Sequence, residues 1–498
     1  MLRMRGATKK TISGALACAA LSLAAGSALA GTPFQNDVTT SINMGIEWLA
    51  TNNAFTGGAG DVTGLATQAL LEKRASGNPA DPPSGYVGAS AVDKGRLRSA
   101  VVYMINQTQA NGAGMYSYRD GQRLFALSGY ALTGGPDKSV LGTTITIKQA
   151  MDALTDKLLT NQNAQGYWCY NNGGCNDSST TQFASAGLEA ARTFYLSPAS
   201  GDTPYADAAR AASITTALTN VAAVYAASTG TGSDNASCNV LSATERGHGY
   251  HAPIEGYKPS LQQTASGIYI QLFGGSDVNS PGVQHYMEWI KNRYRYSDLD
   301  SMGNSWPSNS YSYYLWSSFK GMELIRQSGV APNVGNVGPN DYGTLPAASS
   351  PACVQRQVNK DPATLPQVAL FGAGPVGYYT LETKGQYFDY AHEILGTQQV
   401  GGGYFGNLGV GAGRFPWENF SHQSYMLLVL QRSTGNVQLK CDVNGDGKID
   451  STDIKAIMAA IGKPPVAGDV RDFNGDGVIN IVDVRQCTLQ CTNARCAP

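Results

Sequence analysis

The chain has 498 residues, of which 14% are charged and 42% are hydrophobic, and its formal net charge is −1. A chain of this length accommodates two or three domains. The low charged fraction and the balanced charge argue against a disordered chain and against a polycation that binds nucleic acid.

The N-terminus has the pattern of an export signal. Basic side chains within the first ten positions precede an apolar run from Ile12 to Leu29, which ends in Ala28-Leu29-Ala30. A basic head, a short apolar middle and a small-residue end predict a signal peptide over residues 1–30. The run is short and rich in Ala, Gly and Ser, which disfavours the alternative of a membrane anchor. We therefore expect a secreted, periplasmic or cell-surface protein with no membrane span after signal removal.

Export gives the cysteines a structural role, because disulfides persist in oxidising compartments. Cys169 and Cys175 are close enough in sequence to staple one turn, and Cys238 and Cys353 are left to pair by elimination. A terminal set has three possible connectivities and consists of Cys441, Cys487, Cys491 and Cys496. This set has no CxxC pair, so we favour disulfides over a zinc site.

From Phe34 to about Arg432 the chain alternates two kinds of predicted helix. Larger amphipathic helices are expected at 42–53, 96–109, 145–161, 206–228, 283–296 and 386–398. Smaller helices, rich in small residues, follow at 62–73, 122–132, 178–192, 261–273, 311–326 and 421–432. Alternating helices without strand-like patterns predict an all-α repeat array. Six pairs can close into a ring, and we assign this domain to residues 31–435.

A long insert at 327–385 separates the last two helix pairs. It is rich in Gly, Pro, Ala and Asn. Connections of this length are usually lids or flexible excursions. We expect a loop that covers the cavity mouth and is tied down by Cys353.

Parts of the array resemble known families. The spacing of Gln162, Gly166 and Trp168 resembles the repeat motif of terpene cyclases, and the stretches 311–322 and 421–430 resemble inner helices of protein prenyltransferase β subunits. The resemblance implies an (α/α)6 toroid with its site at one mouth of a central cavity. It identifies a fold better than a reaction.

The catalytic motifs of these families are incomplete. The nearest match to the cyclase Asp-x-Asp-Asp cluster is Asp298-Leu-Asp300-Ser301, which lacks the last carboxylate. His422 stands where the prenyltransferase zinc histidine would be, but the other two ligand positions match Ser308 and Ser310. The Gly-Cys-Gly-Glu-Gln run of thioester-containing relatives is absent. Terpene cyclase and zinc prenyltransferase chemistry are therefore disfavoured.

Other candidate residues lie in the turns that lead into the smaller helices. We interpret Asp61, Asp120 and Asp177 as helix caps. Glu255 and Glu418 lie in aromatic loops and are better site candidates. Our catalytic candidates are Glu255, Asp300, Glu418 and His422. His248 and His251 are interpreted as a hydrogen-bonding pair rather than as metal ligands.

These residues leave three kinds of activity open. Two carboxylates across an aromatic cleft would suit glycoside hydrolysis. A set of Tyr, His and Arg would suit a lyase, which abstracts a proton beside a carboxylate. Aromatic rings alone would form a sugar-binding groove without chemistry.

The tail contains two twelve-residue loops with oxygen ligands at positions 1, 3, 5, 9 and 12 and a backbone carbonyl at position 7. The first loop supplies Asp442, Asn444, Asp446, Lys448, Asp450 and Asp453. The second supplies Asp472, Asn474, Asp476, Val478, Asn480 and Asp483. Glycine stands at position 6 of both, where the loop turns sharply. Hard oxygens in this order predict one Ca²⁺ ion in each loop.

Each loop precedes a single predicted helix, at 451–461 and 481–489, whereas Pro464-Pro465 excludes a helix entering the second loop. This loop–helix repeat resembles a type I dockerin over residues 440–498. The resemblance implies a cohesin-like partner for residues 441–498, with loop positions 10 and 11 helping to choose it. Those positions differ between the copies, Ser451-Thr452 against Ile481-Val482, so two equivalent binding faces are in doubt. The alternative is a structural calcium clip without a partner.

Two functions remain open for the whole chain. In the first, the ring is an enzyme of polysaccharide degradation, acting by hydrolysis of O-glycosyl bonds or as a lyase. In the second, the ring binds a glycan, a lipid or a peptide without catalysis, and the tail serves assembly or structure.

Overall fold

We analysed a computed structural model of the chain. It describes residues 31–79, 81–197, 205–227, 231–232, 244–251, 259–297, 311–350, 353–368, 377–398, 402–406, 416–435, 441–443, 449–465, 469–473, 477–489, 491 and 496. Within these ranges the side chains of 231–232, 348–350, 353–355 and 416–418 are not described.

The twelve main helices of the larger domain fall into two sets. The outer set consists of α1 (Pro33–Thr51), α3 (Ala91–Ala110), α6 (Ile147–Thr160), α8 (Ala208–Ala226), α10 (Pro281–Asn292) and α12 (Gln386–Thr397). The inner set consists of α2 (Thr63–Leu71), α4 (Ser117–Leu132), α7 (Ser178–Leu196), α9 (Leu261–Phe273), α11 (Tyr311–Ser328) and α13 (Pro416–Leu430). Short helices η1 (Ala54–Thr56), η2 (Gly60–Val62) and α5 (Lys138–Leu141) lie in the connections.

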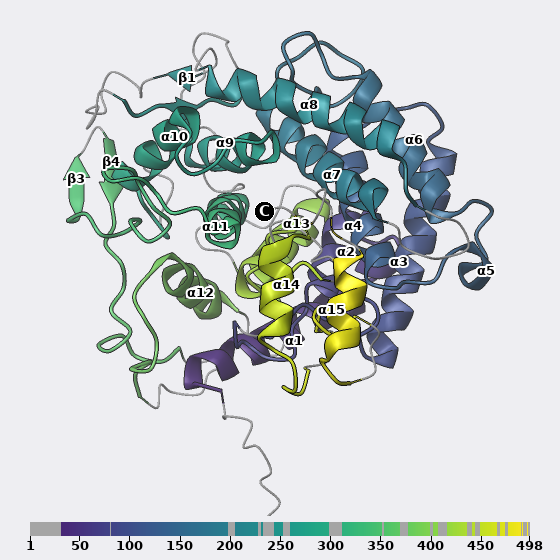
Figure 1. Cartoon of the computed structure of the whole chain (residues 1–498). Coiled ribbons are helices and arrows are strands. Elements are labelled where there is room, and N and C mark those ends of the chain that lie inside the picture. Colours follow the sequence, from purple (N-terminus) through teal and green to yellow (C-terminus); the bar gives the residue numbers. More distant parts are fainter. Residues whose placement is uncertain are drawn as a thin grey trace, which may run out of the picture.

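The inner helices form a closed circuit of contacts. Each packs on the next, in the order α2, α4, α7, α9, α11 and α13, and α13 packs on α2. Figure 1 shows these helices around the centre of the molecule, with the outer helices surrounding them. Because inner and outer helices alternate along the chain, all inner helices begin at the same face.

Burial explains why the two sets have different sequences. Every residue of α2 is buried, and α9 leaves only Leu272 incompletely buried. Outer helix α1 instead buries one stripe, whose spacing of three and four residues is typical of an amphipathic helix: Phe34, Val38, Ser41, Ile42, Gly45, Ile46 and Leu49. Inner helices pack on both sides, α2 with several small side chains and α11 with large aromatic rings.

The closest inner pair is joined backbone to backbone. An added Cβ atom at Gly121 of α4 would lie 2.2 Å from the carbonyl oxygen of Phe183, and one at Gly187 of α7 would lie 2.4 Å from the carbonyl oxygen of Gly121. Real Cβ atoms do not approach so closely, so both positions require glycine.

The all-α class is confirmed, and all twelve predicted helices are present in the described part of the chain. The strands there form two short antiparallel hairpins: β1 (Thr231–Gly232) with β2 (Gly247–His248), and β3 (Ala348–Ser350) with β4 (Cys353–Arg356). Helix α1 begins at Pro33 rather than at residue 42. Thr32 and Gln35 form a capping box there, and proline occupies the first turn.

The described part of the insert lies beside outer helices α10 and α12. Gln357 N donates to Tyr294 O just after α10 (2.8 Å), and Lys360 N donates to the Asp389 carboxylate of α12 (2.8 Å). Val337 N donates to Gln284 of α10 (2.7 Å). Tyr342 and Tyr390 flank Tyr294 with ring centroids 5.8 and 6.0 Å away, so the insert fills the space between α10 and α12.

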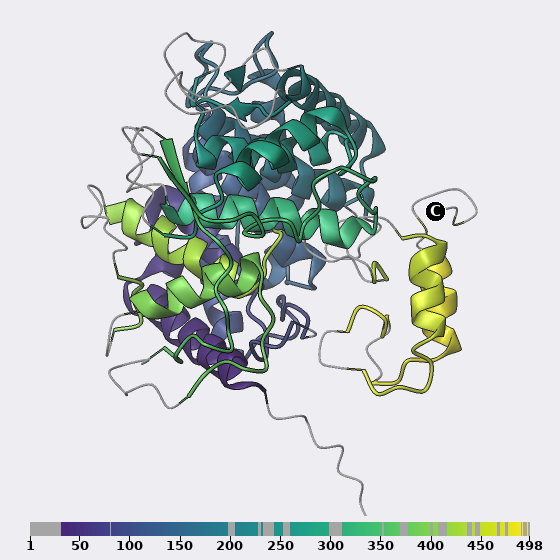
Figure 2. The same ribbon diagram turned by 90° about the vertical axis from the view of Figure 1, so that its left-hand side faces the viewer.

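The tail has its own small core. Helices α14 (Ser451–Met458) and α15 (Ile481–Thr488) enclose a cluster separate from the larger core: Cys441, Ile449, Ile457, Ala460, Ile479, Val484 and Cys487. Figure 2 shows the two helices standing beside the main body. The two domains therefore bury separate cores.

Disulfides join Cys169 to Cys175, Cys441 to Cys487, and Cys491 to Cys496. The last two select one of the three possible connectivities of the terminal set. Cys238 and the predicted signal peptide lie outside the described residues. Among the helices that the structure describes, none is long and apolar enough to cross a membrane.

Candidate functional site

The N-terminal ends of three inner helices are tied together by hydrogen bonds. Ser117 N at the start of α4 donates to Tyr170 O, and Ser178 N at the start of α7 donates to Tyr250 O, each at 3.0 Å. Ser178 Oγ also donates to Gln263 Oε1 of α9 at 2.8 Å. The turns before α4, α7 and α9 therefore meet at one face of the helix circuit.

A cleft of about 330 Å³ opens at this face. Its walls come from η2, the end of α3, the start of α4 and the disulfide-bridged turn before α7. It is lined by Asp61, Asn111, Gly114, Met115, Tyr116, Arg119 and Asn171. A cleft with one aromatic ring, two amides and both signs of charge is suited to a polar ligand.

Arg119 is held by the carboxylate of Asp120. Its Nε donates to Asp120 Oδ1 (2.7 Å) and its Nη2 to Oδ2 (3.2 Å), while Asp120 also accepts from Tyr116 N (2.9 Å). The guanidinium carbon lies 5.6 Å from the centroid of the Tyr116 ring. Nη1 makes no hydrogen bond to a described residue, which leaves two N–H groups for a ligand. Asp120 caps α4 as predicted, and both of its carboxylate oxygens accept hydrogen bonds.

Asp61 differs from the other two predicted caps. It is exposed, lies in η2, and makes no hydrogen bond or ion pair with the residues that the structure describes. Its cap assignment is therefore wrong, because a capping carboxylate must accept a backbone N–H. Burial, followed by the nearby Tyr170 and Asp61, raises the pKa of Tyr116 to about 12. Tyr116 thus keeps its proton at neutral pH and can donate it.

A second polar group continues from the cleft toward α9. Tyr170 stacks on Tyr116 with ring centroids 5.8 Å apart, and its hydroxyl lies 2.8 Å from that of Tyr250. Ser179 Oγ lies 3.2 Å from the Tyr170 hydroxyl. Burial raises the pKa of Tyr170 and of Tyr250 above the usual range. The Cys169–Cys175 disulfide holds the turn that carries Tyr170.

Asp177 caps α7 as predicted. Its Oδ1 accepts from Thr180 N (2.9 Å) and from Ser179 Oγ (2.6 Å). Its Oδ2 is buried without a hydrogen-bond partner among the described residues. Such an atom is costly to bury, so water or a ligand group is expected beside it.

The structure describes only some of the catalytic candidates expected from the sequence. Glu255 and Asp300 lie outside the described residues, and Glu418 falls in the first turn of α13 without a described side chain. His422 lies further along α13, where burial lowers its pKa to about 4. Its Nε2 has no hydrogen-bond partner in the described part of the chain. His422 does not line the cleft, but α13 contacts η2, which carries Asp61.

His248 is a structural residue. Its Nδ1 lies 2.7 Å from Gly249 O and its Nε2 lies 2.9 Å from the Tyr167 hydroxyl, and its ring stacks on Tyr225. The carbonyl can only accept, so Nδ1 carries the proton and Nε2 accepts from Tyr167. His248 is thus hydrogen-bonded rather than placed as a metal ligand. Its partners are Gly249 and Tyr167, so it does not pair with His251 as we expected.

Sequence reasoning missed Arg119, Asn111 and Asn171 as site residues. Tyr116 and Trp168 were visible only as aromatic markers of the turns after Gln109 and Gln162. The recurrence of these Gly- and aromatic-rich turns was the available signal, because equivalent turns of a repeat meet at one face.

The tail loops repeat the same hydrogen bonds. The position-12 carboxylate of the first loop, Asp453, accepts from Val443 N (2.8 Å) and Asp450 N (2.9 Å). In the second loop, Asp483 accepts from Phe473 N and Asn480 N, each at 2.9 Å. The identical pattern shows that the two copies fold alike.

These loops suit a divalent cation. Five loop carboxylates are buried, and burial of several like charges is costly unless a cation or hydrogen bonds compensate it: Asp442, Asp450, Asp453, Asp472 and Asp483. Ca²⁺ prefers hard oxygen ligands of this kind. The ligands at 444, 446, 448, 474 and 476 lie outside the described residues. In the part of the chain that the structure describes, no group of three His, Cys, Asp or Glu side chains is placed to hold a metal.

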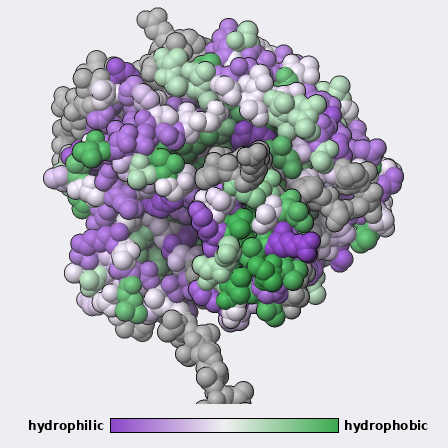
Figure 3. Space-filling model, viewed as in Figure 1, coloured by the Kyte–Doolittle hydropathy of each residue, from purple (hydrophilic) through white to green (hydrophobic). Residues whose placement is uncertain are grey.

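One face of the tail is apolar and exposed. Figure 3 shows hydrophobic side chains gathered where α14 and α15 lie in Figure 1. The exposed residues are Met458, Ile461, Val478, Ile481, Val482 and Leu489. Ile481 and Val482 of the second copy correspond to Ser451 and Thr452 of the first copy, which are polar. The two copies therefore present different surfaces at these positions.

The chain thus consists of a mainly helical domain followed by two loop–helix repeats with the ligand order of a calcium site. Residues 440–488 match the Dockerin type I domain, so the tail is a type I dockerin. This match supports calcium as the bound ion and a cohesin-like protein as the partner class.

One curated relative is an "Ulvan lyase, long isoform" of Glaciecola sp. (strain KUL10), 37% identical over 62 residues. The match covers 12% of this chain, which spans 6% of that relative's length. No solved structure matches the chain.

Proposed function

We propose that this protein is an exported enzyme that cleaves glycosidic bonds of an acidic polysaccharide and is delivered by its dockerin. The observation that carries the proposal is the cleft beside Arg119 and Tyr116, on a chain that ends in a type I dockerin. In this proposal the helix circuit of residues 31–435 is an (α/α)6 toroid of the terpene-cyclase-like kind, residues 1–30 are its signal peptide and 440–498 its dockerin. The short similarity to an ulvan lyase adds support.

The residues of the cleft favour elimination over hydrolysis. Hydrolysis needs two available carboxyl groups, whereas Asp120 and Asp177 cap helices and leave Asp61 as the available carboxylate lining the cleft. In elimination, the two N–H groups of Arg119 Nη1 bind the substrate carboxylate and acidify the neighbouring C–H.

The proton balance can be met within the cleft. Asp61 takes the proton from the carbon beside the substrate carboxylate, the C–O bond to the leaving sugar breaks, and Tyr116 gives its proton to the leaving oxygen. The product carries a C=C bond conjugated with its carboxylate. Glu255, Asp300, Glu418 and His422 remain candidates for additional acid, base or binding roles at the same face.

The tail is proposed to bind two Ca²⁺ ions and to dock into a cohesin-like partner. The same loops support both proposals, because their ligand order fits calcium and their helices carry the exposed apolar face.

The test is an assay of the purified protein on carboxylated, sulfated and neutral polysaccharides. Elimination gives ultraviolet absorbance together with new reducing ends, whereas hydrolysis gives reducing ends alone. We expect Tyr116→Phe and Arg119→Lys to lower kcat/KM by about 100-fold or more. Tyr378→Phe, at an exposed tyrosine of the insert, is the matched control and should retain activity. Reducing ends without ultraviolet absorbance would contradict elimination.

A second candidate function is glycan binding without catalysis. This function is favoured because Asp120 and Asp177 accept backbone hydrogen bonds at helix starts and are therefore not available as catalytic acids or bases. Binding to a polysaccharide without any bond cleavage across the panel would select it.

A further inference from the structure

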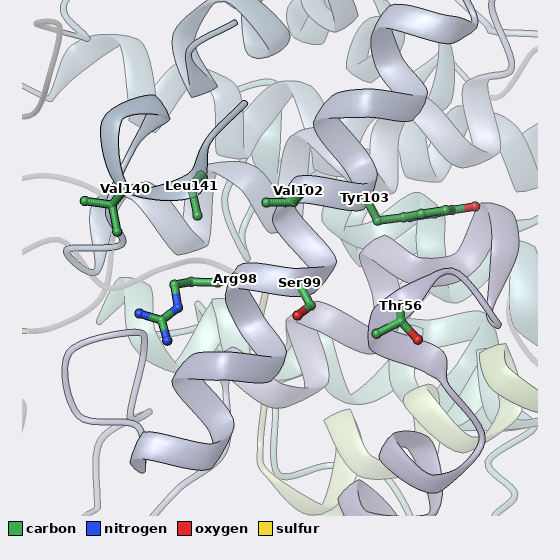
Figure 4. Close-up of a pocket in the computed structure, with 7 residues that line it drawn as sticks. All are labelled: Thr56, Arg98, Ser99, Val102, Tyr103, Val140 and Leu141. Carbon is green, nitrogen blue, oxygen red and sulfur yellow. The ribbon is translucent and has the colours of Figure 1, made fainter. Parts of the chain in front are cut away.

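A second, larger groove lies on the outer face of α3, away from the candidate active site. It has a volume of about 450 Å³ and lies between α3, η1 and α5 (Figure 4). Its lining consists of Thr56, Arg98, Ser99, Val102, Tyr103, Val140 and Leu141. None of these residues lines the cleft at Arg119.

Four of the lining residues belong to one face of α3. Arg98 and Ser99 lie one helical turn before Val102 and Tyr103, a spacing that places all four side by side. Figure 4 shows their side chains along α3, with Val140 and Leu141 across the groove and Thr56 at its edge. The groove is therefore built by a rigid helix and not by a single loop.

The guanidinium of this groove is available for a ligand. Arg98 is exposed and makes no hydrogen bond or ion pair with the described residues. The neighbouring Arg96, in contrast, binds Glu47 through Nη1 and Nη2 (2.7 and 2.8 Å) and Asp93 (3.0 Å). The Tyr103 hydroxyl is likewise without a hydrogen bond to the described residues. Two neighbouring arginines thus have different roles, one structural and one free.

The ring of Tyr103 is held in place by a glycine. At Gly57, whose φ is +105°, an added Cβ atom would lie 2.6 Å from Tyr103 Cε2. A side chain at this position would therefore displace the ring. Gly57 fixes Tyr103 against η1, so the ring presents a preformed apolar surface to the groove.

The charge of the groove selects the ligand. Arg98 is the one charged residue among those that line it, and no acidic side chain is present there. A guanidinium binds carboxylate or sulfate oxygens through paired N–H groups. The Tyr103 ring and the side chains of Val102 and Leu141 offer apolar surface for the C–H face of a sugar. The hydroxyls of Thr56 and Ser99 donate to Asn53 O (3.2 Å) and Gly95 O (3.1 Å), so they can accept hydrogen bonds from sugar hydroxyls.

We propose that this groove is an auxiliary binding site for an acidic saccharide. Asn111, which lines the cleft, stands eight residues after Tyr103 on α3, about 12 Å along the helix. One polysaccharide chain can therefore span both sites. The choice of an acidic saccharide rests on the proposed function, whereas the groove and its free guanidinium do not.

The experiment measures binding of the full-length protein to polygalacturonate, dextran sulfate and neutral dextran by affinity electrophoresis. The variants are Arg98→Gln, Tyr103→Ala and Gly57→Ala, with Arg485→Gln as a control for loss of an exposed positive charge. We expect each groove variant to weaken binding of the charged polymers about tenfold and Arg485→Gln to leave it unchanged. Circular dichroism establishes that every variant is folded.

The outcomes separate this inference from the proposed function. Retention of binding by an Arg119→Gln variant, which removes the positive charge of the cleft, with loss in Arg98→Gln, supports a site distinct from the cleft. Arg98-dependent binding without any cleavage would support the groove as a binding site and contradict the proposed enzyme activity. Unchanged binding by Arg98→Gln, or equal binding of neutral dextran, overturns the inference. Preferential binding of an acidic peptide or nucleic acid in competition would show that the ligand of the groove is not a saccharide.

Discussion

The hydroxyl groups of Tyr170 and Tyr250 lie 2.8 Å apart and join the turn before α7 to the segment before α9. Ser179 Oγ lies 3.2 Å from the first and 3.4 Å from the second. Both tyrosines keep their protons, because burial raises their pKa values above the usual range. Their three hydroxyls form one network beside the ring of Tyr116, which stacks on Tyr170.

This network predicts non-additive effects of substitution. Tyr170→Phe and Tyr250→Phe each retain the ring but remove a hydroxyl, so each should lower the free energy of unfolding by about 1 kcal/mol. The double variant should cost less than the sum, because both single variants break the same hydrogen bond. Chemical denaturation followed by tryptophan fluorescence measures this cycle. Strict additivity would show that the two hydroxyls act independently.

The contact of Gly121 with Gly187 predicts a large effect of a single methyl group. Gly187→Ala places a Cβ atom 2.4 Å from Gly121 O, and the two helix backbones must separate. We expect a loss of about 1–3 kcal/mol in the free energy of unfolding, the usual cost of overpacking.

Gly95 provides the matched control. It lies in α3, and an added Cβ atom there meets nothing within 4 Å. Gly95→Ala should therefore raise stability by up to about 1 kcal/mol, through helix propensity alone. Equal effects of Gly187→Ala and Gly95→Ala would mean that α4 and α7 do not meet at these glycines.

Three histidines with lowered pKa values, one buried and two half-buried, predict acid sensitivity of the larger domain. Burial lowers the pKa values of His248, His392 and His422 to about 4, from 6.5. The unfolded chain binds more protons between these values, so stability is complete above about pH 6.5 and falls as the pH drops toward 4. Each histidine contributes on the order of 3 kcal/mol.

Asp389 acts in the opposite direction. Burial raises its pKa to about 7, so its contribution to stability is lost as the pH rises from about 4 to 7. Burial also raises the pKa values of Asp37 and Glu72 and lowers that of His285. Three carboxyl groups therefore oppose four imidazoles, and we expect the melting temperature to fall as the pH drops from 6.5 to 4.5. A shallower fall in His248→Gln, measured by fluorescence-detected melting, would assign part of the slope to that ring. A melting temperature that is constant over this range would contradict the assignment.

The sequence predicted those features whose determinants are close together in the chain. Asp177 caps α7 three residues before the backbone N–H that it binds, and the calcium ligands of each loop lie within twelve residues. The helices were recognisable for the same reason, since capping and small-residue patterns are local. Sequence reasoning therefore succeeded for the helix class and for the dockerin.

The cleft and the insert depend on contacts between distant residues. Asp61 and Asn171 line one cleft although 110 positions separate them, and nothing near Arg119 in sequence reveals that one face of its guanidinium is free. The insert was expected over a mouth. Its Tyr342 ring packs at a tilt against Tyr294, and this aromatic contact places it beside α10. Such contacts follow from packing of the whole domain, which local patterns do not encode.

Calcium removal should affect the tail alone. Its core contains few buried side chains, and several buried carboxylates would repel one another without the ion. We expect chelation to remove amide-exchange protection in 449–465 and 477–489. Tryptophan fluorescence should not change, because all six tryptophans precede residue 418 and so report on the larger domain. Loss of tryptophan signal on chelation, or full protection of the tail without calcium, would contradict separate domains or calcium-dependent folding, respectively.

The asymmetry of the tail predicts a single docking face. Ile481 and Val482 are 64% and 47% exposed, and their counterparts Ser451 and Thr452 are polar. Buried apolar anchors dominate most protein interfaces, so Ile481→Asp with Val482→Asp should weaken binding to a type I cohesin module at least about tenfold, or 1.4 kcal/mol. Ser451→Asp with Thr452→Asp is the matched control, since acidic residues are favourable in the first turn of either helix. Isothermal titration calorimetry compares the two pairs in calcium. Equal losses for both pairs would mean that the two faces are used interchangeably, and no loss for either would place the partner surface elsewhere.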